Sequence, residues 1–227
     1  MGPRPADEAL RTLDSLMPGS THPATDLTRA AFLVMLGRVE EGMHLGREAR
    51  RALADLGGRN QGIAAFAEMQ WLVGDREAAA EEMRIAYDFL ERSKQVGYLA
   101  YYAPRLGRML CALGRYDEAA PLAARGRECT AAGDRAAEIA WRQTQALVDS
   151  HRGLHTEAEA LAREAVAFAE MTDVLNNQGD AFSDLAEVLS SAGKPEEARA
   201  ALEQALDRYD RKRNLVAAAR VRERLAG

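Results

Sequence analysis

Apolar residues recur along most of the chain at the spacing of helical faces. Leu185, Val188 and Leu189 share one face of a segment, and Leu202 and Leu206 share a face of the segment that follows it. Spacing of three and four residues is typical of amphipathic α-helices, so the pattern predicts an all-α protein. The predicted helices form five consecutive pairs, at 23–36 with 39–56, 60–73 with 76–93, 98–113 with 116–132, 134–151 with 155–171, and 175–191 with 195–212.

A glycine separates the two helices of each predicted pair. The five glycines are Gly37, Gly74, Gly114, Gly153 and Gly193, which follow one another at intervals of 37 to 40 residues. This period is too long for a coiled-coil heptad and is typical of stacked helix pairs. We expect each glycine to end the first helix of its pair in a left-handed turn, a conformation that alanine would resist.

Three columns of small residues keep register with these glycines. The positions seven residues before the glycines are Ala30, Ala67, Gly107, Ala146 and Ala186; those five residues after them are Gly42, Ala79, Ala119, Ala158 and Ala198; those twelve residues after them are Ala49, Ala86, Gly126, Ala165 and Ala205. Two helices can cross closely only where neither carries a bulky side chain, so the columns predict the helix crossings.

These columns resemble the tetratricopeptide repeat family, whose unit has a small residue in its first helix, a turn glycine, and small residues in its second helix. The resemblance covers about residues 24–210. It implies a right-handed α-solenoid of about five helix-turn-helix repeats plus terminal helices. The usual unit of the family has 34 residues, so the longer period of this chain implies longer helices.

The last third of the chain, from AREAVAFAEMTDVLNNQGD onward, is similar to the C-terminal tails of large bacterial signalling proteins. In those proteins an adenylate cyclase-like or LuxR-type module and an AAA-type ATPase module precede a long tetratricopeptide-like tail. The resemblance brings no catalytic residues, because these belong to the preceding modules. It implies the tail of a bacterial signalling or transcriptional regulator.

The repeats divide the chain into three parts. Residues 21–213 form the five repeats, residues 1–20 form a half-repeat or an N-terminal capping helix, with a helix expected at 6–17, and residues 214–227 form a C-terminal capping helix. A half-repeat would leave an apolar face exposed. Two explanations of residues 1–20 therefore stay open: a natural cap, or the beginning of a segment within a longer protein.

The resemblance also implies a binding groove, because the first helix of each tetratricopeptide repeat lines the concave face. Projecting the family's groove positions onto this chain gives a mainly apolar first repeat, with Leu27, Ala31 and Met35 among its positions. The candidate binding residues of the other repeats are Gln61, Glu68, Trp71, Tyr101, Arg108, Gln143, His151, Asp180, Ser183 and Glu187.

Trp71, Tyr101, Arg108 and Gln143 combine aromatic anchors with polar groups, as peptide sites do. Alternatively, Trp71 and Tyr101 fill core between helices, and Arg108 is the better candidate for exposure. The family's carboxylate-clamping branch requires Lys, Asn and Arg at these positions, and Arg108 alone fits. The acidic Asp180 and Glu187 would instead attract a basic segment or a partner domain.

We therefore expect a non-enzymatic scaffold that binds a protein or peptide partner, a small effector, or upstream effector or ATPase domains of the same polypeptide. The alternative is a self-association module that dimerises attached effector domains. We expect no cofactor, no metal and no catalytic residue. His151 and His155 stand on either side of the turn at Gly153, so their spacing does not place them on one helix face.

Composition narrows the class of partner. The formal net charge is −5, which disfavours nucleic-acid binding because phosphate neutralisation needs a basic face. The basic run RYDRKR at 208–213 lies near a predicted helix C-terminus, where cations favour the helix dipole.

No apolar run is long enough to span a membrane and no signal peptide is recognisable, so we expect a cytoplasmic protein. Cys111 and Cys129 lack metal-ligand spacing and are expected to be buried.

Two prolines fall inside predicted helices of the third repeat. Pro104 should kink or delay the first of these helices, because proline removes a backbone donor and crowds the preceding turn. Pro121 lies about five residues into the second. Either the surrounding structure accommodates the two prolines locally, or they produce a bend that the protein uses for binding.

Overall fold

The computed structural model describes residues 2–56 and 59–227, apart from the side chains of residues 59–61. The described residues form twelve α-helices and no strand. The helices are α1 (Ala6–Leu16), α2 (Pro23–Met35), α3 (Val39–Asp55), α4 (Arg59–Val73), α5 (Arg76–Arg92), α6 (Val96–Ala112), α7 (Tyr116–Cys129), α8 (Arg135–His151), α9 (His155–Glu170), α10 (Leu175–Ser191), α11 (Pro195–Lys212) and α12 (Leu215–Ala226). None of the described helices is long and apolar enough to cross a membrane.

Helices α2 to α11 are the five predicted pairs, and the turn inside each pair confirms the role expected for its glycine. The backbone angle φ is +81° at Gly37, +91° at Gly74, +74° at Gly114, +78° at Gly153 and +73° at Gly193. This left-handed region strains residues that carry a Cβ atom. The periodic glycines therefore set the tight reversal that lets each second helix pack back on the first.

The three columns of small residues are buried at every position. The column positions that hold glycine have no room for a Cβ atom. A Cβ atom at Gly42 would lie 2.8 Å from the carbonyl oxygen of Ala30, and one at Gly126 would lie 2.1 Å from Cγ of Pro104. Helices cross at these points without room for a larger side chain, as the sequence predicted.

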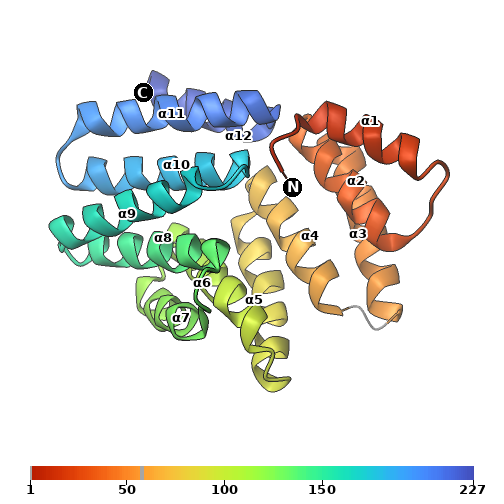
Figure 1. Cartoon of the computed structure of the whole chain (residues 1–227), viewed down its shortest axis with the longest axis horizontal. Coiled ribbons are helices and arrows are strands. Elements are labelled where there is room, and N and C mark those ends of the chain that lie inside the picture. Colours follow the sequence, from red (N-terminus) through yellow and green to blue (C-terminus); the bar gives the residue numbers. More distant parts are fainter. Residues whose placement is uncertain (1, 57–58) are drawn as a thin grey trace.

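The first helices of successive pairs form the inner wall of a curved stack (Figure 1). Helix α2 packs on α4, α6 on α8, and α8 on α10, while each second helix packs against its own partner and the next repeat. The packing between α4 and α6 is weaker than between the other neighbouring first helices. The inner wall therefore opens between the second and third repeats.

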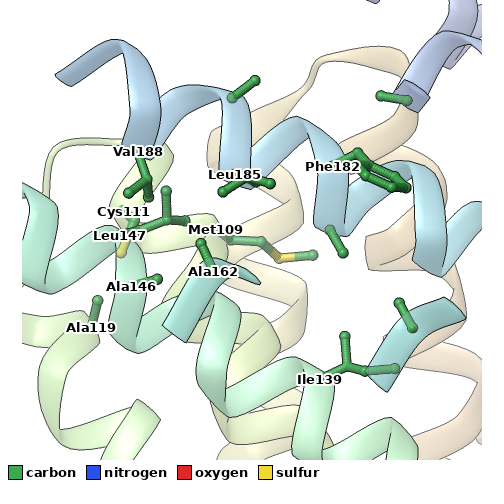
Figure 2. Close-up of a cluster of buried hydrophobic side chains, with 14 of the residues drawn as sticks. Met109, Cys111, Ala119, Ile139, Ala146, Leu147, Ala162, Phe182, Leu185 and Val188 are labelled. Carbon is green, nitrogen blue, oxygen red and sulfur yellow. The ribbon is translucent and has the colours of Figure 1, made fainter. Parts of the chain in front are cut away.

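The main core runs between the later repeats. Figure 2 shows side chains of α6, α8 and α10, such as Met109, Leu147 and Leu185, pointing toward one another. Leu185 is 5% exposed and Met109 is 3% exposed. Helices with one apolar face bury it by stacking, so each repeat depends on its neighbours for stability.

The C-terminal helix closes the stack on itself. Helix α12 follows α11 and also contacts α2 and α4, which are far away in the sequence (Figure 1). Beside this contact, Nζ of Lys212 donates hydrogen bonds to the carbonyl oxygens of Gly2 at 2.9 Å and Arg4 at 2.6 Å. The concave face is consequently enclosed between the two ends of the repeat array.

Both prolines of the third repeat lie inside continuous helices. Helix α6 runs from Val96 to Ala112 through Pro104, so the proline does not delay its start, and α7 runs from Tyr116 through Pro121. The carbonyl oxygen of Pro104 accepts a hydrogen bond from Oγ1 of the buried Thr144 at 2.7 Å. The proline ring itself packs over Gly126, so neighbouring helices accommodate it locally.

Candidate binding cavity

A cavity of about 430 Å³ occupies the concave face. One wall consists mainly of apolar side chains from α2 and α4, including Leu27, Met35 and Leu72. The opposite wall is polar and comes from α10 to α12, including Asn177 and Arg220. A volume of this size and an amphipathic lining are typical of ligand pockets.

A smaller hollow of about 130 Å³ continues the cavity along α10 and α12. It is strongly charged, with Arg76, Arg108, Arg220 and Arg224 facing Asp180, Asp184 and Glu187. The two hollows share five lining residues, which are Trp71, Asp180, Tyr209, Ala217 and Arg220. An apolar compartment and a charged compartment therefore meet at Trp71 and Arg220.

An ion pair between repeats three and five forms part of the wall of the charged compartment. Nε and Nη2 of Arg108 donate to the two carboxylate oxygens of Asp184 at 2.7 and 2.8 Å, and Nε2 of Gln143 donates to the same carboxylate at 2.8 Å. Burial raises the pKa of Asp184, and the Arg108 guanidinium offsets part of that rise. This bidentate geometry keeps Arg108 protonated and orients both side chains.

Asp180 is also engaged by its neighbours. Its Oδ1 accepts a hydrogen bond from the Tyr209 hydroxyl at 2.7 Å and lies 3.8 Å from Nη2 of Arg108. Burial raises the pKa of Tyr209 well above its ordinary value, so the hydroxyl remains a donor at neutral pH. Of the two acidic residues expected to attract a basic segment, Asp180 is thus already bound by Tyr209 and lies near Arg108.

Arginine side chains lie over the aromatic rings at the cavity. The guanidinium carbons of Arg76 and Arg108 lie 5.2 and 5.7 Å from the Trp71 ring centroid, and that of Arg105 lies 4.3 Å from the Tyr101 ring. Arg105 also pairs with Glu68 of α4. These cation–π contacts orient the aromatic rings beside the cavity.

The structure brings most of the predicted residues together. Glu68, Trp71, Tyr101 and Asp180 line the large cavity; Arg108 and Gln143 line a narrow extension of about 20 Å³ beside α6 and α8. Ser183 and Glu187 line the smaller hollow. Trp71 combines the two alternatives, because it lines the cavity and also packs against the main core.

Three of the expectations about individual site residues are not confirmed. The expected exposure of Arg108 is wrong: its side chain is 17% exposed because Asp184 binds it. His151 is exposed and lies outside the cavity lining, with its ring stacked on Tyr116 at a centroid distance of 3.8 Å. Gln61 lies outside the described side chains.

Several cavity residues have no counterpart in the projected columns. Asn177 lies in the first turn of α10, Tyr209 lies in a second helix, and Arg220 belongs to α12, outside the repeats. The repeat pattern assigns groove positions only on first helices, and α12 reaches the cavity solely because the stack closes. A search for polar residues in the first turns of first helices would have found Asn177.

The cysteines are buried, as predicted. Cys111 is 2% exposed, Cys129 is 8% exposed, and both thiols are free. Burial raises the pKa of Cys111 to about 12, which keeps it a thiol at neutral pH. Among the described residues, no cluster of three His, Cys, Asp or Glu side chains could hold a metal ion.

Paired helices curved around a concave cavity define a helix-pair solenoid, a class of interaction scaffold. Residues 137–211 match the model of the tetratricopeptide repeat family. No curated protein matches the sequence.

Solved structures share this fold at low sequence identity. BtubC (BKLC) from P. vanneervenii has a TM-score of 0.59 at 15% identity, over 98% of this chain and 90% of that one. NprR in complex with its cognate peptide NprX has a TM-score of 0.63 at 14% identity, over 92% of this chain and 64% of NprR. A tetratricopeptide repeat protein from Parabacteroides merdae has a TM-score of 0.54 at 15% identity, over 96% and 84%. At these identities the likeness concerns the fold alone.

Proposed function

We propose that the chain binds a peptide segment of a partner protein in the concave cavity and acts as a non-enzymatic sensory scaffold. The observation that carries this proposal is the cavity of about 430 Å³, in which an apolar wall faces a polar wall. A peptide presents both kinds of group, because apolar side chains alternate along a polar backbone. Such a ligand would contact both ends of the repeat array and stabilise its closed form.

Amide side chains suit the backbone of such a peptide. Asn176 and Asn177 of α10 both line the large cavity. Asn176 accepts a hydrogen bond from Asn214 at 3.2 Å, whereas the Asn177 amide makes no hydrogen bond to another described residue. A free carboxamide offers one acceptor and two donors, which match the N–H and C=O groups of a peptide bond.

We further propose that this scaffold is the tail of a bacterial signalling or transcriptional regulator, with residues 21–213 forming the repeats between two capping segments. The similarity of residues 162–225 to such tails supports this assignment. The likeness to NprR, which was solved with its cognate peptide, supports a peptide as the kind of ligand. Upstream effector or ATPase domains are the partners that the binding event would influence.

The direct test is retention of a pool of pentapeptides on the immobilised chain. Tyr101 lines the cavity, whereas Tyr98, one helical turn earlier in α6, is 48% exposed and outside the lining. We expect Tyr101→Ala to weaken retention about tenfold through lost contact with the ligand. The matched variant Tyr98→Ala should retain peptides as the unaltered chain does. Retention no greater than on an unrelated immobilised protein would refute the proposal.

Self-association is the alternative function. Light scattering over a concentration range distinguishes the two, with an Arg108→Glu, Trp71→Ala variant that alters the cavity. A monomer throughout supports ligand capture. A dimer that dissociates in this variant would mean that the cavity residues serve self-association instead.

A further inference from the structure

The charged compartment holds more guanidinium groups than its carboxylates engage. Arg76, Arg220 and Arg224 line it, and none of the three lies within 4.0 Å of a carboxylate oxygen of another described residue. Arg220 is half-buried, and its Nη1 donates a hydrogen bond to the carbonyl oxygen of Trp71 at 3.2 Å. A guanidinium has five N–H donors, so most of its donors are available to a ligand.

The carboxylates of the same compartment are mostly committed. Asp184 receives three hydrogen bonds from Arg108 and Gln143, and Asp180 accepts one from Tyr209. Glu187 is the remaining acidic residue, and it makes no ion pair among the described residues. The compartment thus has three arginines without a carboxylate partner and one carboxylate without a cation partner, although the whole chain has a net charge of −5.

Arg220 lies between the two compartments. It lines both of them, together with Trp71, so it is placed to contact a ligand that spans the two compartments. Arginine is the side chain best suited to bind a carboxylate in a bidentate manner.

We propose that the cavity selects peptides bearing a carboxylate, which Arg220 binds with Arg76 and Arg224 beside it, while a neighbouring apolar side chain occupies the compartment between α2 and α4. This inference rests on the proposed function and specifies the ligand of that site. The carboxylate comes either from the C-terminus of the peptide or from an Asp or Glu side chain. Both present the same planar group to a guanidinium.

The experiment compares matched acetylated pentapeptide pools on the immobilised chain, with retention measured by mass spectrometry. One pool ends in leucine with a free carboxylate and its match ends in leucinamide; a second leucinamide pool contains one internal Glu and its match contains Gln. We expect the pools with a carboxylate to be retained about tenfold more strongly than their neutral matches. The difference should shrink in 0.5 M salt, because screening weakens exposed charge interactions.

Substitutions of three arginines assign the preference to Arg220. Arg220→Gln should abolish the difference between matched pools, because glutamine can still donate to the Trp71 carbonyl but carries no charge. Arg220→Lys should keep part of it, and Arg152→Gln, at an exposed position outside the cavity lining, should keep all of it. Equal thermal unfolding of the variants excludes misfolding. If Arg220→Gln proves unstable, Arg76→Gln, at an exposed position, should independently decrease the difference in retention between the matched pools.

The outcomes separate this inference from the function on which it rests. Peptides retained equally with and without a carboxylate, or a preference that survives in Arg220→Gln, would overturn the inference and leave peptide binding intact. If only the free C-terminus or only the internal Glu is preferred, the source of the carboxylate is identified. Retention of no pool above background would overturn both proposals.

Discussion

Single residues determine where this chain turns. The five turn glycines have φ between +73° and +91°, and an added Cβ atom at any of them would meet no atom within 4 Å. The reason for glycine at these positions is therefore backbone conformation rather than lack of space. At the column positions the reason is the reverse, because a Cβ atom at Gly42 or Gly126 would collide with the neighbouring helix.

Gly153→Ala isolates the conformational requirement. We expect the free energy of unfolding to fall by about 1 kcal/mol, because alanine is strained at φ +78°. Gly97 in α6 is the matched control, since it also has open space around an added Cβ atom but does not have positive φ. Gly97→Ala should be neutral or stabilising by about 0.5 kcal/mol, measured by urea denaturation. Equal effects of the two substitutions would contradict the assignment.

Ala146→Leu tests the packing of a column position. Ala146 is fully buried between helices, so we expect overpacking to cost about 1–3 kcal/mol of unfolding free energy. The control Ala160→Leu is at an exposed site in α9 and should change stability by less than about 0.5 kcal/mol. Unchanged melting of Ala146→Leu would mean that the repeat register is wrong.

At the scale of helices, ion pairs link the second helices of successive repeats. Nε of Arg125 in α7 lies 2.7 Å from Glu91 in α5, and Nζ of Lys194, directly before α11, lies 2.7 Å from Glu159 in α9. Hydrogen bonds from Arg125 and Lys194 lower the pKa values of Glu91 and Glu159 below the ordinary 4.5. Their partial exposure limits each pair to a small contribution.

These pairs predict a loss of stability in acid. A carboxylate whose pKa is lower in the folded state stabilises the protein above pH 4.5, and this contribution disappears as the pH falls through the folded pKa. The double variant Glu91→Gln, Glu159→Gln should therefore lose less unfolding free energy than the unaltered chain between pH 6 and pH 3, by roughly 1 kcal/mol. Identical pH profiles in urea denaturation would show that the pairs contribute nothing.

At the scale of the whole molecule, closure of the stack depends on contacts between its two ends. Lys212 is 1% exposed, donates to the carbonyl oxygens of Gly2 and Arg4, and lies 5.8 Å from the ring centroid of Phe32. Burial without a carboxylate lowers the pKa of Lys212. The lysine thus ties the N-terminal segment to the last repeat.

Lys212→Met should loosen this connection. Two carbonyl oxygens lose their donor, which we expect to destabilise the local structure by about 1–3 kcal/mol and to speed hydrogen exchange in α1. The neighbouring exposed Arg211→Met should leave the exchange unchanged. Unaltered exchange in Lys212→Met would mean that the packing of α12 on α2 and α4 holds the closure by itself.

The sequence by itself determined the repeat and its helices. Glycine at a left-handed turn and a small residue at a crossing are requirements that each repeat imposes locally, so they recur with the period and can be read from it. The predicted helix bounds agree within a few residues, and α6 runs through Pro104 without the delayed start that the proline suggested. Of the cavity, the projection found Glu68, Trp71, Tyr101 and Asp180 for the same reason.

Only the tertiary structure decided which charges face the cavity. Arg220 meets Trp71 across 149 residues, and Arg108 meets Asp184 across 76. Lys212 lies in a basic run interpreted as cations that favour the dipole at a helix C-terminus, yet the N-terminal segment buries it. No local pattern encodes these contacts, because they arise from curvature that accumulates over all the repeats until the ends of the stack meet.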